Sequence, residues 1–296
     1  MIYDSVIIGA GPAGLTAAIY LLRSNLKVAI IEEAVPGGQM GNTYKIDNYP
    51  GFESVDGFTL ATNMYMQVMN LGAEHIADKA VEITKTEHGF DVMLSESVVK
   101  GKTVIIATGM KNRRLGIPSE TKYAGKGVSW CAICDGNFYK GMDVAVLGGG
   151  NSSLEESLYL SGIVRKVYLI HRRNEFRGED FLVNKVKNTP NIELVLSEEV
   201  KELHGGEFLE KIELKSGRVL EVSGLFEYIG YLPNSELVRK FDVVDEQGYI
   251  ITDESFATKI EGLFAAGDIV RKNVRQIVTA VNDGAIAALA VAKCCR

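Results

Sequence analysis

The sequence predicts an α/β protein with two repeated units, each containing a β-strand, a glycine-rich turn and a helix. In the first unit Tyr3–Ile8 has the composition of a short buried strand, Gly9–Gly14 forms the turn, and an apolar-periodic helix continues to about Leu22. Lys27–Ile31 is then a second buried strand, which ends at Glu32. The chain therefore opens with a strand–helix–strand unit.

The same pattern returns in the middle of the chain. Asp143–Leu147 is predicted as a strand, Gly148–Ser153 as the turn, and Leu154–Ser161 as the helix. Lys166–Ile170 is the next buried strand. Two such openings in one chain indicate two nucleotide-binding units.

The segments outside these two openings are predicted as further strands and a final helix. Ala73–Leu94 alternates like antiparallel strands, Lys102–Thr108 is a buried strand that runs into Gly109, and Gly262–Asp268 repeats this strand-to-glycine form. The last helix is expected to present one apolar face at helical spacing, formed by Val274, Val278, Val281, Ala285 and Ala288. The turns at Leu115–Pro118 and Gly230–Pro233 are the expected domain boundaries.

Composition and charge exclude several classes of protein. Hydrophobic residues make up 46% of the chain, which is ordinary for a soluble globular protein. The net charge of −6 argues against a surface built for nucleic acid. Met1–Ile8 lacks the basic and long apolar regions of a targeting signal, and the apolar run Ala285–Ala292 is too short to cross a bilayer. We expect a soluble, cytoplasmic protein that binds neither nucleic acid nor membrane.

The first glycine turn has the spacing of a dinucleotide-binding motif. Gly9 permits the tight turn, Gly11 lets the backbone approach a pyrophosphate, and Gly14 lets helix and strand pack closely. The pyrophosphate then sits at the helix N-terminus, where free N–H groups favour negative charge. Glu32, at the end of the next strand, is placed to bind a ribose. The alternative is a glycine-rich turn without a ligand.

The second glycine turn is followed by a basic segment. Gly148 and Gly150 keep the motif, whereas Ser153 stands where glycine or alanine usually allows close packing of the helix. After the next strand, at the place where an NAD-selective fold has its acid, the chain has His171-Arg172-Arg173 and then Arg177. Arginines there suit the 2′-phosphate of NADP. The alternative is a solvated basic loop.

One cysteine pair points to redox chemistry. Two residues separate Cys131 from Cys134, which allows a reversible disulfide, and this spacing commonly lowers the pKa of one thiol. Asp135 is a nearby proton donor or acceptor. A zinc site is the rival interpretation, but the sequence has no second pair of cysteines or histidines at ligand spacing, so we predict no metal.

A second cysteine pair lies at the C-terminus. Cys294 and Cys295 could form a shuttle disulfide on a tail, as some flavin disulfide reductases do. Adjacent cysteines close only a strained ring, however, and chain termini are usually frayed. We predict that these two residues are not catalytic.

Taken together, the motifs resemble those of one family, the low-molecular-weight (bacterial-type) thioredoxin reductases, which are flavoproteins among the pyridine nucleotide-disulfide oxidoreductases. The resemblance covers nearly the whole chain. The motifs, in order, are Gly9–Gly14, Gly37–Met40, Ile46–Gly51, Ala107–Gly109, Cys131–Gly136, Gly148–Ser153, His171–Arg173 with Arg177, and Ala265–Asp268 with Arg275 and Gln276.

The resemblance implies FAD in the first site and NADPH in the second. The FAD contacts that it implies are Gly9, Gly11, Pro12, Ala13, Gly14, Glu32, Gly38, Gln39, Asn48, Thr108, Gly109, Gly267, Asp268, Arg275, Gln276 and Ile277. The NADPH contacts that it implies are Gly148, Gly150, Asn151, Ser152, Ser153, His171, Arg172, Arg173 and Arg177.

The resemblance also implies a fold, an activity and an assembly. Two Rossmann-like FAD/NAD(P)-binding domains of the three-layer ββα type are expected, with residues 115–233 as an NADPH domain inserted into an FAD domain formed by residues 1–114 and 234–296. Cys134 would face the flavin, Cys131 would attack oxidised thioredoxin, and Asp135 would act as the acid. A homodimer is implied as well. Asn137 replaces an aromatic residue that some members have before Phe138, which bears on how thioredoxin docks.

Four other functions are compatible with parts of the pattern. Ferredoxin could replace NADPH as electron donor, but such relatives are expected to lose the arginine cluster and the second glycine turn. Enzymes that reduce peroxiredoxins resemble this core but carry additional N-terminal redox domains, whereas here the first strand begins at the start of the chain. A flavin-binding sensor without turnover would not need the cysteine pair, and ferredoxin–NADP reductases of similar build lack that pair.

Overall fold

The structure, a computed structural model, describes residues 1–43 and 45–295. The chain divides into two compact units. Unit 1 combines the two ends of the chain, Met1–Lys111 and Leu232–Arg296, and unit 2 is the middle segment Asn112–Tyr231. The strands that join them, β7 (Met110–Asn112) and β16 (Tyr231–Pro233), pair with each other.

Unit 1 is built on a parallel sheet. β1 (Ile2–Ile8) lies between β2 (Val28–Ile31) and β6 (Val98–Ile106), and β3 (Glu74–Ile76) pairs with β2. On the other side β17 (Leu263–Ala265), from the far end of the chain, pairs with β6 in parallel. β2, β17 and the last residues of β1 and β6 are continuous runs of apolar residues because both faces of the sheet are covered there.

The segment between the first helices and β6 differs in part from the prediction. β4 (Glu82–Thr86) and β5 (Gly89–Met93) are antiparallel, and β5 pairs with the first part of β6. The antiparallel interpretation of Ala73–Leu94 was therefore right for these two strands and wrong for β3, which runs parallel to β2. Alternation shows that a strand is half-covered, but it does not identify the partner of the strand.

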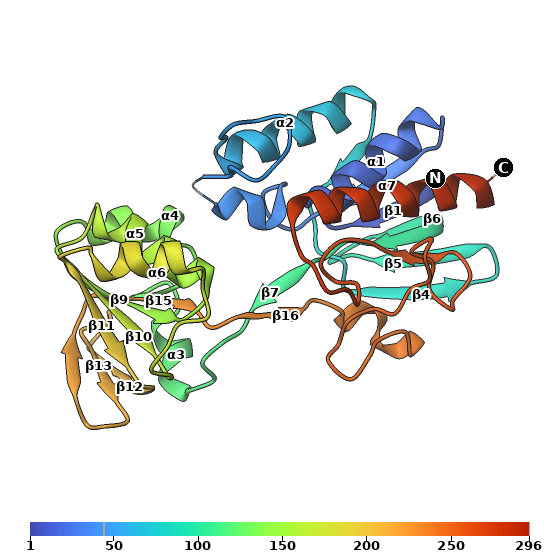
Figure 1. The fold of residues 1–296 in the computed structure, drawn as a ribbon. Coiled ribbons are helices and arrows are strands. Elements are labelled where there is room, and N and C mark those ends of the chain that lie inside the picture. Colours follow the sequence, from blue (N-terminus) through green and yellow to red (C-terminus); the bar gives the residue numbers. More distant parts are fainter. Residues whose placement is uncertain (44, 296) are drawn as a thin grey trace. The chain divides into compact units, whose positions relative to one another are not determined.

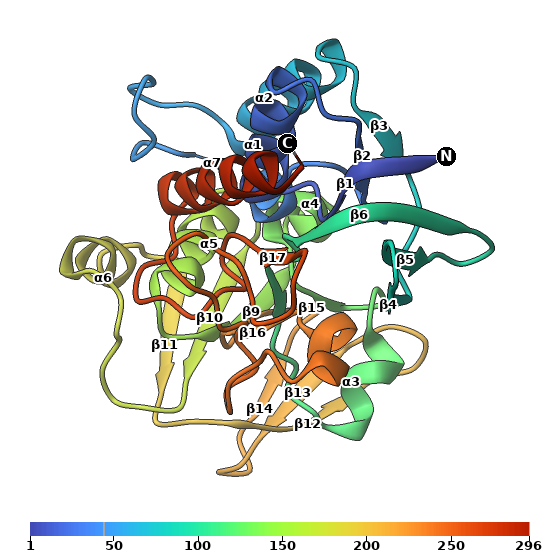
Figure 2. The ribbon, with the colours of Figure 1, turned by 90° about the vertical axis from the view of Figure 1, so that its right-hand side faces the viewer.

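Three helices cover one face of this sheet. They are α1 (Pro12–Arg23), α2 (Gly57–Asn70) and α7 (Ile277–Cys294), and α1 and α7 lie side by side although they come from opposite ends of the chain (Figures 1 and 2). Asp56 caps α2 by accepting a hydrogen bond from the Thr59 N–H at 2.8 Å.

Side chains of β1 alternate between two cores. Ile7 packs with the helices, whereas Val6 and Ile8 pack on the opposite face with β4, β5 and the C-terminal segment that contains η3 (Glu236–Phe241). Unit 1 thus has three layers, with the parallel sheet in the middle.

The buried face of α7 differs from the predicted one. Val274 lies before the helix and Val278 is exposed, so of the predicted face only Ala288 is fully buried. The buried residues of α7 are Ala280, Asp283, Gly284, Ala287, Ala288, Val291 and Ala292. α1 approaches so closely that small residues, rather than the largest apolar ones, form the contact.

Among the described residues α7 is the one helix that is long and apolar enough to span a membrane by length and composition. The sequence prediction considered only the uninterrupted run at 285–292, whereas the helix spans Ile277–Cys294. Its inner face packs against α1 and carries Asp283, which is buried and pairs with Lys272. We interpret α7 as a core helix of unit 1.

Unit 2 repeats the layered plan around a second parallel sheet. Its strand order is β11-β10-β9-β15-β8, with every neighbouring pair parallel. The strands are β8 (Val128–Ser129), β9 (Asp143–Gly148), β10 (Lys166–His171), β11 (Ile192–Leu196) and β15 (Gly224–Tyr228).

Two further layers cover this sheet. One face packs against the antiparallel strands β12 (Val200–His204), β13 (Lys211–Leu214) and β14 (Val219–Glu221). The other face packs against α5 (Asn151–Ser161) and α6 (Asp180–Lys187). The remaining elements of unit 2 are α3 (Pro118–Tyr123), α4 (Ala132–Asp135) and η2 (Gly136–Tyr139).

The contact between α1 and α7 generates a prediction about stability. A Cβ atom added at Gly284 would lie 2.1 Å from the Ala13 carbonyl oxygen. We expect Gly284→Ala to lower the free energy of unfolding by about 1–3 kcal/mol, because overpacking against backbone outweighs the gain in helix propensity of about 1 kcal/mol. Urea unfolding followed by circular dichroism measures the change.

The matched control is Gly206→Ala. In that exposed turn the added Cβ would meet only Glu210 Oε1, at 3.7 Å, so little change is expected. Equal stability of the two variants would show that α7 does not depend on this close approach.

Candidate functional site

The first glycine turn joins β1 to α1 under tight steric limits. Gly9 has a φ of +107°, and a Cβ there would lie 2.4 Å from the Ala107 carbonyl oxygen. A Cβ on Gly14 would lie 2.0 Å from the Gly9 carbonyl oxygen. Both positions therefore require glycine, for the reasons that the motif predicts.

The N-terminus of α1 is open toward a ligand. Gly11 is the N-cap, Pro12 is the first helical residue, and the first turn contains no acidic side chain. The backbone of Gly38 lies against Gly11, since a Cβ on Gly38 would be 3.2 Å from Gly11 Cα. Two predicted motifs that are distant in sequence thus meet at a helix end whose first N–H groups have no partner within the helix.

Glu32 follows β2 and is held by backbone groups. Its Oε2 accepts a hydrogen bond from the Ala10 N–H at 2.9 Å, and its Oε1 accepts one from the Ala34 N–H at 3.0 Å. The carboxylate is therefore fixed beside the glycine turn, as expected of a group that binds a ribose.

Other residues predicted for the first site form pairs across the unit. Asn48 Nδ2 donates to Gln276 Oε1 at 3.3 Å, and Gln276 is the N-cap of α7, so Ile277 is its first residue. Thr108 Oγ1 donates to the Asn234 carbonyl oxygen at 2.7 Å. Gln39 is not part of these pairs, because its Nε2 donates to the Met110 carbonyl oxygen.

Asp268 is the clearest open binding position in unit 1. Its Oδ1 atom is buried and has no hydrogen-bond partner among the described residues. Burial raises the pKa of Asp268, while Lys272 and Arg275 act in the opposite direction. Arg275 Nε donates to the Asp268 carbonyl oxygen at 3.2 Å. Lys272 forms an ion pair with this oxygen at 3.6 Å, beyond hydrogen-bond distance, so the atom can still accept a hydrogen bond from a ligand.

Sequence reasoning missed Lys272. Its Nζ lies 2.6 Å from Asp283 Oδ2 and 3.6 Å from Asp268 Oδ1. With Arg271, Arg275 and other residues it lines an open cavity of about 800 Å³. The available sequence signal was a lysine four residues after Asp268, but its buried partner lies on α7 and is apparent only in the fold.

The second glycine turn begins its helix earlier than predicted. α5 starts at Asn151 rather than Leu154, because Gly150 is the extended N-cap and the next three residues form the first turn. Ser153 is fully buried, and its Oγ donates to the Gly150 carbonyl oxygen at 2.8 Å. The serine is therefore accommodated where a smaller residue is usual, and the first turn of α5 again contains no acidic side chain.

The basic segment follows β10, as predicted. His171 is buried, and burial and then the positive charges of Arg177, Arg173 and Arg172 lower its pKa. The three arginines are exposed. The Arg177 N–H donates to the Gly149 carbonyl oxygen at 2.7 Å, which ties the basic segment to the glycine turn.

Glu156 is a second residue that sequence reasoning missed. It lies on α5, and its Oε2 atom is buried with no hydrogen-bond partner among the described residues. Burial, followed by the charge of Glu155, raises the pKa of Glu156 to about 7. Its only sequence signal was an acid on the helix that follows the glycine turn.

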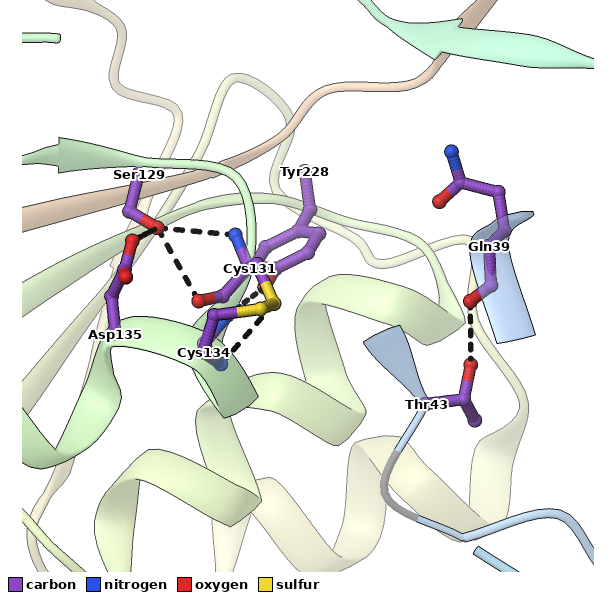
Figure 3. Close-up of a disulfide and its surroundings, with 8 residues drawn as sticks. Gln39, Thr43, Ser129, Cys131, Cys134, Asp135 and Tyr228 are labelled. Atoms are coloured by element: carbon purple, nitrogen blue, oxygen red, sulfur yellow. Dashed lines mark hydrogen bonds between the residues drawn. A yellow bond between two sulfur atoms is a disulfide. The ribbon is translucent and has the colours of Figure 1, made fainter. Parts of the chain in front are cut away.

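Cys131 and Cys134 form a disulfide, with 5.3 Å between their Cα atoms (Figure 3). Cys131 is the N-cap of α4, and its Sγ accepts a hydrogen bond from the Cys134 N–H at 3.2 Å. The same N–H would stabilise a thiolate on Cys131 after reduction.

Ser129 joins Asp135 to the cysteine backbone, and sequence reasoning missed it. Its Oγ donates to Asp135 Oδ2 at 2.6 Å and accepts from the Cys131 N–H at 3.1 Å (Figure 3). The Asp135 N–H also donates to the Cys131 carbonyl oxygen. The predicted acid is therefore held beside the disulfide.

Two consecutive residues of β15 hold the residues on either side of Cys131. Glu227 Oε2 accepts a hydrogen bond from Trp130 Nε1 at 2.9 Å. Tyr228 Oη accepts one from the Ala132 N–H at 2.8 Å, and burial raises the Tyr228 pKa strongly. The residues on both sides of Cys131 are thus held by the carboxyl-terminal end of β15, a strand inside the parallel sheet of unit 2.

The two C-terminal cysteines, and the residues expected to bear on thioredoxin docking, lie at or near the surface. Cys294 ends α7 and is exposed, Cys295 is half-buried, and both are free thiols. Phe138 is 77% exposed and follows the disulfide by a few residues, with exposed Asn137 before it.

The two helix ends, the open Asp268 and the disulfide have complementary chemistry. Each helix end suits the phosphates of a nucleotide, and the orphaned Asp268 and Glu156 oxygens suit its polar groups. The residues present therefore fit two nucleotide cofactors. A disulfide next to a positioned acid can accept two electrons and pass them on by thiol–disulfide exchange.

Comparisons with known proteins agree with this chemistry. The family model "Pyridine nucleotide-disulphide oxidoreductase" matches residues 3–284. Thioredoxin reductase from Ureaplasma parvum is 46% identical over 294 residues, 97% of this chain and 95% of that protein. Thioredoxin reductase from Bacillus subtilis is 41% identical over 296 residues, 98% of this chain and 94% of that protein.

A solved structure extends the agreement to the fold. The crystal structure of Lactococcus lactis thioredoxin reductase matches with a TM-score of 0.93 at 38% identity, over 99% of each chain. Membership of this family implies a flavin and a nicotinamide cofactor. The chain belongs to the thioredoxin reductases of the pyridine nucleotide-disulphide oxidoreductase family.

Proposed function

We propose that the chain binds FAD in unit 1 and NADPH in unit 2, and that it passes electrons from NADPH through the Cys131–Cys134 disulfide to oxidised thioredoxin. The observation that carries the proposal is the closed disulfide beside Asp135, in the same unit as a glycine turn followed by arginines. We further propose a cytoplasmic homodimer, as the family resemblance implies.

The FAD site is assigned to unit 1. Its pyrophosphate would lie at the N-terminus of α1, over Gly11 and Ala13, with Glu32 binding the ribose. The buried Asp268 Oδ1 would accept a hydrogen bond from the cofactor. Once bound, the flavin supplies the two-electron chemistry that links the nicotinamide to the disulfide.

The NADPH site is assigned to the turn between β9 and α5. The pyrophosphate would lie over Gly150, Asn151 and Ser152, at a helix whose first turn contains no acidic residue. Arg172 and Arg173 follow β10 and are exposed, so they can form charge-assisted hydrogen bonds with the 2′-phosphate.

The disulfide carries the electrons out by exchange. Two electrons and two protons break its Sγ–Sγ bond and give two thiols. Cys131, as the thiolate, attacks one sulfur of the thioredoxin disulfide and displaces the other sulfur as a thiolate. Cys134 then attacks Cys131 in the mixed disulfide, which re-forms the original bond and releases the second thioredoxin thiolate. Asp135 supplies or accepts the protons that these thiols exchange.

Anaerobic titration tests this proposal. We expect NADPH to bleach the flavin of the purified protein, and oxidised thioredoxin to restore its absorbance. In Cys134→Ser the flavin should still bleach, but thioredoxin should not restore it, because the disulfide that relays the electrons is gone. If NADPH left the flavin oxidised while reduced ferredoxin bleached it, the proposed electron donor would be wrong.

The role of Asp135 has its own test. In Asp135→Asn we expect kcat for thioredoxin reduction to fall by roughly 100-fold or more, the range typical of a lost general acid. The rate of flavin reduction by NADPH should not change, since that step precedes the disulfide. Stopped-flow absorbance separates the two steps, and an equal loss in both would argue against an acid role.

The arginine cluster predicts nucleotide selectivity. Losing one charge-assisted hydrogen bond costs about 1.5–3 kcal/mol, so Arg172→Ala or Arg173→Ala should raise KM for NADPH by roughly 10–100-fold. KM for NADH, which lacks the 2′-phosphate, should change little. Lys185→Ala, which removes an exposed cation from α6, is the control. If the ratio of KM for NADPH to KM for NADH were the same in the arginine variants as in the parent protein, the arginines would belong to a solvated loop that does not bind the 2′-phosphate.

A further inference from the structure

Two buried glutamates of unit 2 interact with each other, and one of them binds Trp130, the residue before Cys131. Glu120 lies on α3 and Glu227 on β15, and they are 4% and 1% exposed. Glu120 Oε2 accepts a hydrogen bond from the Gly116 N–H at 2.7 Å, and Glu227 Oε2 accepts one from Trp130 Nε1 at 2.9 Å. The other oxygen of each carboxyl is buried and has no hydrogen-bond donor among the described residues.

The chemistry of the pair requires a proton. Two carboxylates that share a buried site cannot both stay ionised without a large cost, and one proton between them gives each orphaned oxygen a partner. Burial, and then the charge of Glu120, raises the pKa of Glu227 to about 8. The folded protein thus keeps this proton where the unfolded chain has released it, so the stability that the pair contributes is lost as pH rises.

One cation, Arg114, acts on the pair. Arg114, before α3, lies with its guanidinium 3.3 Å from the centre of the Trp130 ring and 3.9 Å from Glu120 Oε1. Its charge lowers the pKa of Glu227, against the larger effects of burial and Glu120. From the neighbouring strand β9, Leu147 lies beside Glu227 and brings no charge. Arg114 is therefore the cation that could respond when the pair ionises.

The pair is connected to the disulfide through Trp130. β15 runs parallel to β8, so Glu227 and Tyr228 lie beside the residues that follow β8. Glu227 binds the side chain of Trp130 and Tyr228 binds the backbone of Ala132, which are the two neighbours of Cys131. A shift of Glu227 would therefore move the segment that enters the disulfide.

We propose that Glu227 is a positioning residue for the redox disulfide: the proton that it shares with Glu120 holds Trp130 in place, and loss of that proton in alkaline solution releases it. Two ionised carboxylates would then separate, or draw Arg114 off the Trp130 ring. Either movement disturbs the backbone that enters Cys131. The inference rests on the proposed function only for its effect on thioredoxin reduction.

The chain contains its own reporter, because Trp130 is its single tryptophan. In the holoenzyme we expect the fluorescence emission of Trp130 to change in a single step as the pH is raised into the alkaline range. Glu227→Gln should abolish that step, because the amide oxygen can still accept from Trp130 Nε1 and the amide N–H can replace the shared proton. Glu221→Gln, an exposed acid on β14, should titrate like the parent protein.

Kinetics give the second readout. Thiol–disulfide exchange normally accelerates as pH rises because more thiolate forms. We expect kcat/KM for thioredoxin in the parent protein to fall instead through the step seen in the emission, whereas Glu227→Gln should lack that fall. The rate of flavin reduction by NADPH should be equal in both. Glu227→Leu, which removes the Trp130 partner, should lose roughly 10-fold in kcat/KM at every pH.

Two results would overturn the inference. One is that the fluorescence emission of Trp130 stays constant across the alkaline pH range in the parent protein. The other is that Glu227→Gln shows the same titration step as the parent protein. If Glu227→Leu does not fold, the glutamine variant decides alone. If the parent protein did not reduce thioredoxin, the proposed function would fail, while the emission titration would still decide the proton-sharing pair.

Discussion

Close backbone contact at the glycine positions is the constraint on which unit 1 depends. α1 can start directly at the end of β1 only because nothing larger than hydrogen separates Gly14 from the Gly9 carbonyl oxygen. The same helix then accepts α7 at Gly284, against Ala13. These contacts bring the two ends of the chain together, so the helix N-terminus proposed to hold a pyrophosphate and the Asp268 loop that precedes α7 belong to one unit. A side chain at either contact would separate them.

Unit 2 shows how environment gives similar acids different roles. Asp135 accepts a hydrogen bond from Ser129 and stays beside the disulfide, where a carboxyl can exchange protons with a thiol. Glu227, which is buried and interacts with Glu120, is stabilised in its neutral form. Glu156 has an orphaned buried oxygen on the helix of the second glycine turn. Burial and hydrogen bonding, rather than residue type, separate these three carboxyls.

The sequence was sufficient for features whose chemistry depends on residues close in the chain. The glycine spacing, the Cys131–Cys134 pair and the arginines after β10 are of this kind, and the fold around them agrees with the comparisons. Features that depend on residues brought together by folding were not predictable. The buried face of α7 was wrong because helical periodicity does not show which face a neighbour will approach. The partners of Trp130 were missed because β15 and the segment before α3, which carries Arg114, meet it only in the folded unit.

A redox disulfide needs supports that do not depend on its own sulfur–sulfur bond. While Cys131 and Cys134 are joined, the bond itself fixes the loop, but that constraint disappears each time the pair is reduced. The contacts of Trp130 with Glu227 and of Ala132 with Tyr228 involve no sulfur, so neither contact requires the disulfide to be closed. Both come from one rigid strand of the parallel sheet. Since thiol–disulfide exchange requires an accessible and correctly directed sulfur, contacts that hold both neighbours of Cys131 suit the attacking role that we propose for this residue.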